Sequence, residues 1–346
     1  MINQLTLIQP DDWHVHLRDN EALDVTVPAA ARYFGRSIVM PNLKMPVRKV
    51  TDASRYRQRI LQHRPKGSKW LPLMVLYLTD DTSKEDIFEA KKSGFVHAVK
   101  YYPAGATTNS ANGVSQLTRL DPIFDAMQNS DLVLQIHGEV TDENTDIFDR
   151  ESVFIDRHLR RIKEQFPELR IVLEHITTAQ AVQYVEENDR YLSATITPQH
   201  LLYNRNHMLV GGIQPHLYCL PILKRDTHQK ALVKAATGGS KKFFLGTDSA
   251  PHAMEAKESA CGCAGCFSHP AALELYAEVF DQADVMHHLE AFSSINGAQF
   301  YQLPLNESQI TLVKESWTVP HEIPYCGSKI VPLAAGTKLN WKVKLP

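Results

Sequence analysis

Short apolar runs recur along the chain, and most of them are followed by a stretch in which apolar residues have helical spacing. Eight runs are typical of buried strands and lie at residues 13–17, 37–42, 71–79, 95–103, 132–139, 170–177, 192–198 and 242–249. Amphipathic stretches at 52–64, 83–94, 119–130, 149–166 and 178–189 lie between them. Suitable N-capping residues open three of these stretches, namely Thr51 or Asp52, Ser83 and Thr178.

Strands that alternate with helices predict a parallel sheet covered by helices. Eight such units in a chain of 346 residues predict an α/β fold of the TIM-type (β/α)8 barrel class. A doubly wound open sheet is the alternative. That fold usually has a glycine-rich turn after its first strand, and this chain has no such turn there.

The remaining segments lie mainly near the two ends. Residues 4–9, 310–319 and 337–346 have strand-like patterns, and one further helix is predicted near 226–237 in the long segment 199–242. No linker or low-complexity tract interrupts the chain. We therefore expect a single domain over 1–346, with short flanking strands at about 1–10 and 305–346.

Composition narrows the class of protein. Hydrophobic residues make up 43% of the chain and charged residues 22%, and the formal net charge is −2. This balance is typical of a globular protein and gives no indication of nucleic-acid or membrane partners. No apolar run approaches the ~18 residues of a membrane span, and the N-terminus has no secretory-signal pattern. Five cysteines, an odd number, favour a reducing compartment, so we expect a cytoplasmic location.

Candidate chemistry begins at the first barrel strand, in the segment DDWHVHLRD at residues 11–19. Alternate residues of a strand share a face, so His14, His16 and Arg18 are expected on one side. Trp13, Val15 and Leu17 are then expected on the other side.

Polar residues also end several later strands, in phase with small or apolar residues that could fill a barrel interior. The carboxyl ends of barrel strands converge on one mouth, where active sites lie. The candidates at these ends are Asn42 (in phase with Ile38 and Met40), Lys100 (Val96 and Ala98), His137 (Val133 and Gln135), His175 (Ile171 and Leu173) and Asp248 (Phe244 and Gly246).

Four histidines and an aspartate at one mouth predict a metal site, because imidazole and carboxylate suit zinc and similar ions. His14 and His16 can bind one ion, which Asp248 completes, and His137 with His175 can bind a second. A buried ammonium at Lys100 would be strongly disfavoured beside two cations. Carboxylation by carbon dioxide would convert the Lys100 amine into a carbamate whose two oxygens can bridge the ions, and we keep this as a hypothesis.

The whole pattern resembles the amidohydrolase superfamily and, within it, the dihydroorotases of the shorter bacterial type. The resemblance extends over nearly the whole chain, through DDWHVHLRD, IVMPNL, HGEVT, EHITT, ATITPQHL, NRNHMLVGG, PILKR, LGTDSAPH and CGCAGCF. It implies a homodimer with two zinc ions per subunit, bridged by N6-carboxylated Lys100. It also implies reversible hydrolysis of (S)-dihydroorotate to N-carbamoyl-L-aspartate in pyrimidine biosynthesis. None of the six metal positions departs from the family pattern.

The resemblance further implies individual roles. Asp248 is the catalytic residue, which takes the proton of the attacking water and delivers it to the leaving nitrogen. Arg18 binds the substrate carboxylate as a planar fork. The loop at 103–113 is a lid. The substrate-binding set is Arg18, Asn42, His137, Leu220, His252 and Ala264, and the lid residues that reach the substrate are Thr107 and Thr108.

Other functions remain open at this stage. A hydantoinase or allantoinase can use the same metal frame, but Arg18, Asn42 and His252 predict a substrate carboxylate. A mononuclear deaminase would leave Lys100 without a bridging role, and a non-catalytic scaffold would be expected to lose metal ligands.

The cysteine-rich segment CGCAGC has its own alternatives. Cys261, Cys263 and Cys266 crowd together like a zinc knuckle, yet a structural zinc site needs four ligands, and His269 is only a loose candidate for the fourth. We expect this loop to pack near the barrel mouth instead.

Overall fold

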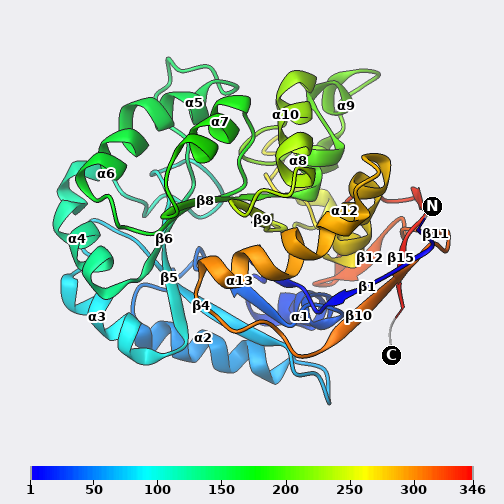
Figure 1. Ribbon diagram of the computed structural model, residues 1–346, viewed down its shortest axis with the longest axis horizontal. Helices are drawn as coiled ribbons and strands as arrows, with labels where there is room; N and C mark the ends of the chain where they lie inside the picture. The colour runs from blue at the N-terminus through cyan, green and yellow to red at the C-terminus, as the bar shows by residue number, and fades with distance from the viewer. Residues whose placement is uncertain (1, 345–346) are drawn as a thin grey trace.

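A closed barrel of eight parallel strands forms the centre of the computed structural model, which describes residues 2–344 (Figure 1). The strands follow one another around the sheet in chain order: β2 (Asp11–Val15), β3 (Arg36–Val39), β4 (Leu71–Tyr77), β5 (Val96–Tyr101), β6 (Val133–Ile136), β7 (Ile171–Leu173), β8 (Leu192–Ile196) and β9 (Phe243–Leu245). The barrel closes where the Asp248 amide donates to the His14 carbonyl at 2.9 Å and the His16 amide donates to the Ser249 carbonyl at 3.0 Å. The predicted barrel and its eight strands are confirmed.

Helices cover the outside of the barrel (Figure 1). The longer ones are α1 (Leu23–Ala31), α2 (Val50–Gln62), α3 (Lys84–Ser93), α4 (Asp121–Ser130), α7 (Ala179–Glu187), α10 (Asp226–Thr237) and α12 (Ala272–Gln282). The stretch predicted at 149–166 forms α5 (Arg150–Phe154) and α6 (Arg160–Gln165), joined by a π-helical turn at Ile155–Leu159. The short helices are α8 (Pro198–Leu202), α9 (Arg205–Leu209), α11 (Met254–Lys257) and α13 (Asn296–Phe300).

The helix starts match two of the three predicted caps. Ser83 accepts a hydrogen bond from the Asp86 amide, and Thr178 accepts one from the Ala181 amide. The prediction of Thr51 or Asp52 as a cap is wrong, because α2 begins two or three residues earlier, with Lys49 as its N-cap. Asp52 is the third residue of this helix, and its carboxylate accepts from the Lys49 amide at 3.1 Å.

The barrel interior opposite the mouth is apolar, and it includes a tryptophan that the strand pattern assigned to the outside. Trp13 packs with interior residues such as Ile38 and Phe244, whereas Val15 belongs to the separate core between barrel and helices. The pairing of β2 with β3 shifts register between Asp12 and Val15, and this irregularity breaks the alternation. The prediction that Trp13 shares a face with Val15 and Leu17 is therefore wrong.

Helix α13 packs against this apolar interior and crosses the barrel in Figure 1. The Trp13 ring stacks on Tyr301, just beyond α13, with centroids 4.7 Å apart. Gly297 makes the contact possible, since a Cβ at this position would lie 2.0 Å from the Trp13 indole nitrogen. The residues below the mouth thus form a packed core and leave no pore.

Short strands outside the barrel join the two ends of the described chain. β1 (Gln4–Ile8), β10 (Gln309–Val313) and β15 (Lys342–Lys344) form an antiparallel sheet with β10 in the middle. β11 (Trp317–Thr318) pairs with β14 (Lys338–Leu339), and β12 (Ile323–Tyr325) pairs with β13 (Ser328–Ile330). Residues 1, 345 and 346 of the predicted flanking segments lie outside the described residues, and the single-domain assignment stays a prediction.

None of the helices formed by residues 2–344 combines the length and the apolar character that a bilayer crossing requires.

Candidate active site

Three predicted metal ligands converge at the barrel mouth. His14 belongs to β2, His16 follows it, and Asp248 lies just after β9. Asp248 Oδ1 is 3.0 Å from His16 Nε2 and 3.4 Å from His14 Nε2, and the two Nε2 atoms are 3.4 Å apart. All three side chains are buried. Two imidazole nitrogens and a carboxylate oxygen facing one point form a donor set that suits a divalent metal ion.

The other two predicted histidines extend this cluster. The ring centroid of His175 lies 5.0 Å from that of His14 and 4.8 Å from that of His137. His175 Nδ1 is buried and has no hydrogen-bond partner among the described residues. Buried polar atoms are normally satisfied, so this unpaired nitrogen also fits a metal ligand.

Lys100 lies at the end of β5 and is completely buried. Its Nζ has no hydrogen-bond partner within residues 2–344. Burial lowers the pKa of Lys100 to about 8, although the negative charges of Glu174 and Asp248 act to raise it. The amine is close to the histidine cluster and has no hydrogen-bond partner among the described residues. This environment agrees with a lysine side chain that is chemically modified when the site is complete.

Two buried carboxylates orient the histidines, and sequence reasoning missed both. Glu174 accepts from His14 Nδ1 at 2.7 Å, and Glu139 accepts from His137 Nε2 at 2.8 Å. Such second partners determine which ring nitrogen is left for a metal. Glu139 follows His137 by two residues, and this spacing was the available signal in the sequence.

His175 does not reach the site through the strand alternation that was predicted for it. Within β7, Val172 faces the barrel interior, whereas Ile171 and Leu173 belong to the outer core. His175 was predicted in phase with Ile171 and Leu173, and that phase would have put it outside. Its backbone has φ 41°, a left-handed conformation that ends the strand alternation.

Positive φ recurs at two other candidate residues. Arg18 has φ 59° and Asp248 has φ 46°, conformations that are uncommon for residues other than glycine. Such strained positions often occur at functional sites. Three of them around one cavity indicate that the fold is shaped for these side chains.

The charge states suit metal binding. Burial, with a further contribution from Lys100, lowers the pKa of His14 and that of His175 well below the usual value. The imidazoles are therefore neutral, the form that binds metals. Burial acts to raise the pKa of Asp248, but the hydrogen bond with His16 and the charge of Lys100 hold it below its usual value.

A small cavity opens beside the cluster, and most of the predicted substrate residues line it. It is bounded by His16, Arg18, Asn42, Tyr102, Thr107, Thr108, His137, His175, Leu220, Asp248, Ala250, Ala264 and Gly265. His252 lies behind Arg18, with its Nε2 2.8 Å from Arg18 Nη2 and 2.9 Å from the Ala264 carbonyl oxygen. The structure thus brings together all the predicted metal, substrate and lid residues.

The loop predicted to be a lid lies against the cavity. Asn42 donates to the Thr108 carbonyl at 2.9 Å, and Asn109 donates to the Asn42 carbonyl at 3.0 Å.

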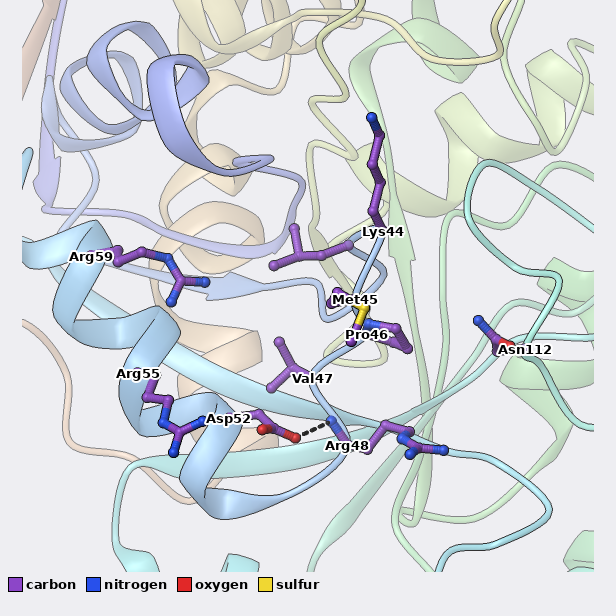
Figure 2. A pocket seen from close by; sticks show the side chains of 10 residues that line it. Lys44, Met45, Pro46, Val47, Arg48, Asp52, Arg55, Arg59 and Asn112 are labelled. Carbon is purple, nitrogen blue, oxygen red and sulfur yellow. Dashed lines mark hydrogen bonds between the residues drawn. The ribbon is translucent and has the colours of Figure 1, made fainter.

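A second hollow lies nearby, between residues 43–48 and α2, with Asn112 of the lid on its far side (Figure 2). None of the predicted site residues lines this hollow. Its lining contains four exposed or half-buried cations, namely Lys44, Arg48, Arg55 and Arg59.

The cysteine-rich loop also reaches the mouth, through Ala264 and Gly265. Within residues 2–344, the only group of histidine, cysteine and acidic side chains close enough to hold an ion is that of His14, His16 and Asp248. His269, the loose candidate for a cysteine site, instead places its Nε2 2.7 Å from Asp12.

Comparison with known proteins agrees with this geometry. The sequence model of the amidohydrolase family matches residues 6–312. A curated dihydroorotase of Pseudomonas savastanoi pv. phaseolicola is 59% identical over 344 residues, which are 99% of each chain. Another, from a Picosynechococcus species, is 59% identical over 341 residues, again 99% of each chain.

Solved structures give the same result. The dihydroorotase of Campylobacter jejuni superposes with a TM-score of 0.91 at 36% identity, covering 99% of this chain and 98% of that one. The dihydroorotase of Saccharomyces cerevisiae in complex with 5-fluoroorotic acid gives 0.91 at 32%, covering 99% of both. An L-hydantoinase of Arthrobacter aurescens reaches 0.78 at 14% identity, covering 98% of this chain and 82% of that one, and shares the fold alone. The chain belongs to the metal-dependent amidohydrolase family and, within it, to the dihydroorotases.

Proposed function

We propose that this protein catalyses the reversible hydrolysis of (S)-dihydroorotate to N-carbamoyl-L-aspartate in pyrimidine biosynthesis. The observation that carries the proposal is one small cavity whose lining includes both the histidine–aspartate metal cluster and Arg18. A ring amide can lie over the cluster while a carboxylate on the same ring meets the guanidinium.

The substrate carboxylate distinguishes this function from that of a hydantoinase or allantoinase. Arg18 is held by its Nε, which donates to the Pro251 carbonyl at 3.2 Å, and this contact aims the rest of its planar fork. Asn42 and His252 complete the carboxylate site in this proposal. Backbone groups of Leu220 and Ala264 contact the ring, and His137 also faces it. Thr107 and Thr108 close over the substrate from the lid and exclude water.

We further propose two zinc ions per subunit, one held by His14, His16 and Asp248 and one by His137 and His175, with N6-carboxylated Lys100 between them. The burial of Lys100 without a partner supports this arrangement, because an isolated buried ammonium is costly and an anionic carbamate between cations is not. When bound, such a pair of ions polarises an amide carbonyl and activates water near neutral pH.

The chain's own residues bind, orient and move the proton. Asp248 has its Oδ1 at the His14–His16 pair, so it can accept the proton of the attacking water there. It then delivers that proton to the ring nitrogen as the amide bond breaks. In the reverse direction Asp248 takes the proton from the attacking nitrogen. Glu174 and Glu139 keep the histidine rings oriented throughout.

We also propose that the protein acts as a homodimer in the cytoplasm. The resemblance to the bacterial dihydroorotases supports the dimer. All five cysteines are free, which agrees with a reducing compartment.

The direct test is an absorbance assay of purified protein with dihydroorotate, run with and without a chelator, and with hydantoin as the competing substrate. We expect turnover of dihydroorotate that the chelator abolishes, and little turnover of hydantoin. Inertness towards dihydroorotate together with turnover of hydantoin would overturn the proposal.

A further inference from the structure

Tyr102 lies at the barrel mouth, one residue beyond the end of β5, and has no assigned role. It is in phase with Ala98, which faces the barrel interior, and with Lys100. Its side chain is 1% exposed and lines the cavity together with Arg18 and Asn42. The Tyr102 hydroxyl has no hydrogen-bond partner among the described residues. A buried hydroxyl is normally paired, so its partner is a group that the chain does not supply.

The ring and the backbone of Tyr102 are both held by contacts with neighbouring residues. It stacks on Tyr77 with ring centroids 5.1 Å apart and an interplanar angle of 29°. Lys100 Nζ lies 5.2 Å from the Tyr102 ring centroid, and the Tyr102 carbonyl accepts from the Val114 amide at 3.1 Å. The backbone contact fixes Tyr102 where the lid loop rejoins the barrel, and the stacking fixes its ring.

We propose that the Tyr102 hydroxyl donates a hydrogen bond to a ring carbonyl oxygen of the bound substrate, which makes Tyr102 a further catalytic residue. This inference rests on the proposed function. A neutral phenol is a donor at neutral pH. Arg18, Asn42 and His252 take the substrate carboxylate, so the acceptors left for Tyr102 are the carbonyl oxygens. No bond to Tyr102 forms or breaks; the hydroxyl stabilises negative charge as it develops on that oxygen.

The test compares Tyr102→Phe with Tyr101→Phe. Each substitution removes one hydroxyl and keeps the ring, but Tyr101 belongs to the core outside the barrel, where its ring packs on Phe154, and it does not line the cavity. We expect kcat/KM for dihydroorotate to fall about 10- to 100-fold in Tyr102→Phe and less than about 2-fold in Tyr101→Phe.

Two readouts besides activity separate a substrate contact from a structural role. Calorimetric titration with 5-fluoroorotic acid should show several-fold weaker binding to Tyr102→Phe, and elemental analysis should show the wild-type zinc content. Unchanged kcat/KM and unchanged binding would overturn the inference. Loss of zinc would also overturn it, since the hydroxyl would then support the metal-binding residues around Lys100 and not the substrate. If the wild-type protein itself does not turn over dihydroorotate, the proposed function fails instead.

Discussion

At the scale of single residues, the candidate site depends on two carboxylates that orient the predicted metal ligands from behind. Glu174 accepts from both His14 and Thr195 at 2.7 Å, so it fixes the His14 ring from behind. Glu139 does the same for His137. The histidines supply the metal-facing nitrogens, and these two glutamates determine which nitrogens those are.

Replacing Glu174 tests this positioning role. In Glu174→Gln the side chain keeps its size but loses its charge, so the bond to His14 weakens. We expect zinc affinity to fall about 10- to 100-fold, measured by competition with a chromophoric chelator. Glu278→Gln is the matched control, because Glu278 is also buried but binds the Asn340 and Trp341 amides far from the histidines. Equal zinc affinity in Glu174→Gln and wild type would refute the role.

A second residue-scale prediction concerns stability in acid. Burial, with further contributions from Arg36 and other cations, lowers the pKa of His97 to about 4. The folded protein therefore keeps His97 neutral, whereas the unfolded chain takes up a proton below about pH 6.5. Stability contributed by neutral His97 is complete above pH 6.5 and is lost as the pH falls towards 4.

Thermal unfolding at pH 7 and at pH 4.5 measures this effect. We expect His97→Gln to lose less stability than wild type over this interval, with a difference of about 2–3 kcal/mol. Identical losses in the two proteins would show that His97 does not titrate as described.

At the scale of elements, the packing of α13 under the barrel gives a prediction for stability. In Gly297→Ala the new Cβ would lie 2.0 Å from the Trp13 indole nitrogen, so helix and ring must separate. We expect a loss of about 1–3 kcal/mol in the free energy of unfolding, measured with denaturant. Gln299→Ala changes an exposed residue of the same helix and should cost less than about 0.5 kcal/mol. Equal stability of both variants would contradict the packing.

The elements also show how far sequence patterns reach. All eight barrel strands were predictable, because parallel strands buried on both faces have continuous apolar runs. The orientations of Trp13 and His175 were not, because a register shift in β2 and a left-handed residue after β7 break the alternation. No pattern of side chains encodes either irregularity.

Besides the short helices α8, α9, α11 and α13, two longer helices were not predicted. Helix α1 contains Pro28, which normally indicates a break. Helix α12 is buried over Ala272–Phe280, yet Glu274, Glu278 and Asp281 have helical spacing, so its pattern was present in the sequence and was overlooked. Its glutamates are buried with partners from other elements, as in the contact of Glu274 with Arg32 at 3.1 Å.

Tyr102 had a usable signal in the sequence, since it continues the alternation of Ala98 and Lys100 along the strand.

At the scale of the whole molecule, the barrel brings distant segments to one point. His14 and Asp248 are separated by most of the chain, yet closure between β2 and β9 puts their side chains 3.4 Å apart. The sheet of β1, β10 and β15 links the segment before the barrel to the segment after it. The predicted metal ligands could be named from sequence because strand ends meet in any such barrel. Glu139 had a sequence signal beside His137, whereas the contact of Glu174 with His14 required the three-dimensional arrangement.

The central claim is that the strand ends assemble a two-metal site that opens dihydroorotate. The most direct measurement is the rate of dihydroorotate turnover by chelator-treated protein as zinc is returned, plotted against zinc bound per chain. We predict no turnover without metal and a rise that is complete at two ions per chain. Full turnover by metal-free protein, or zinc binding that leaves the protein inactive towards dihydroorotate, would contradict the account.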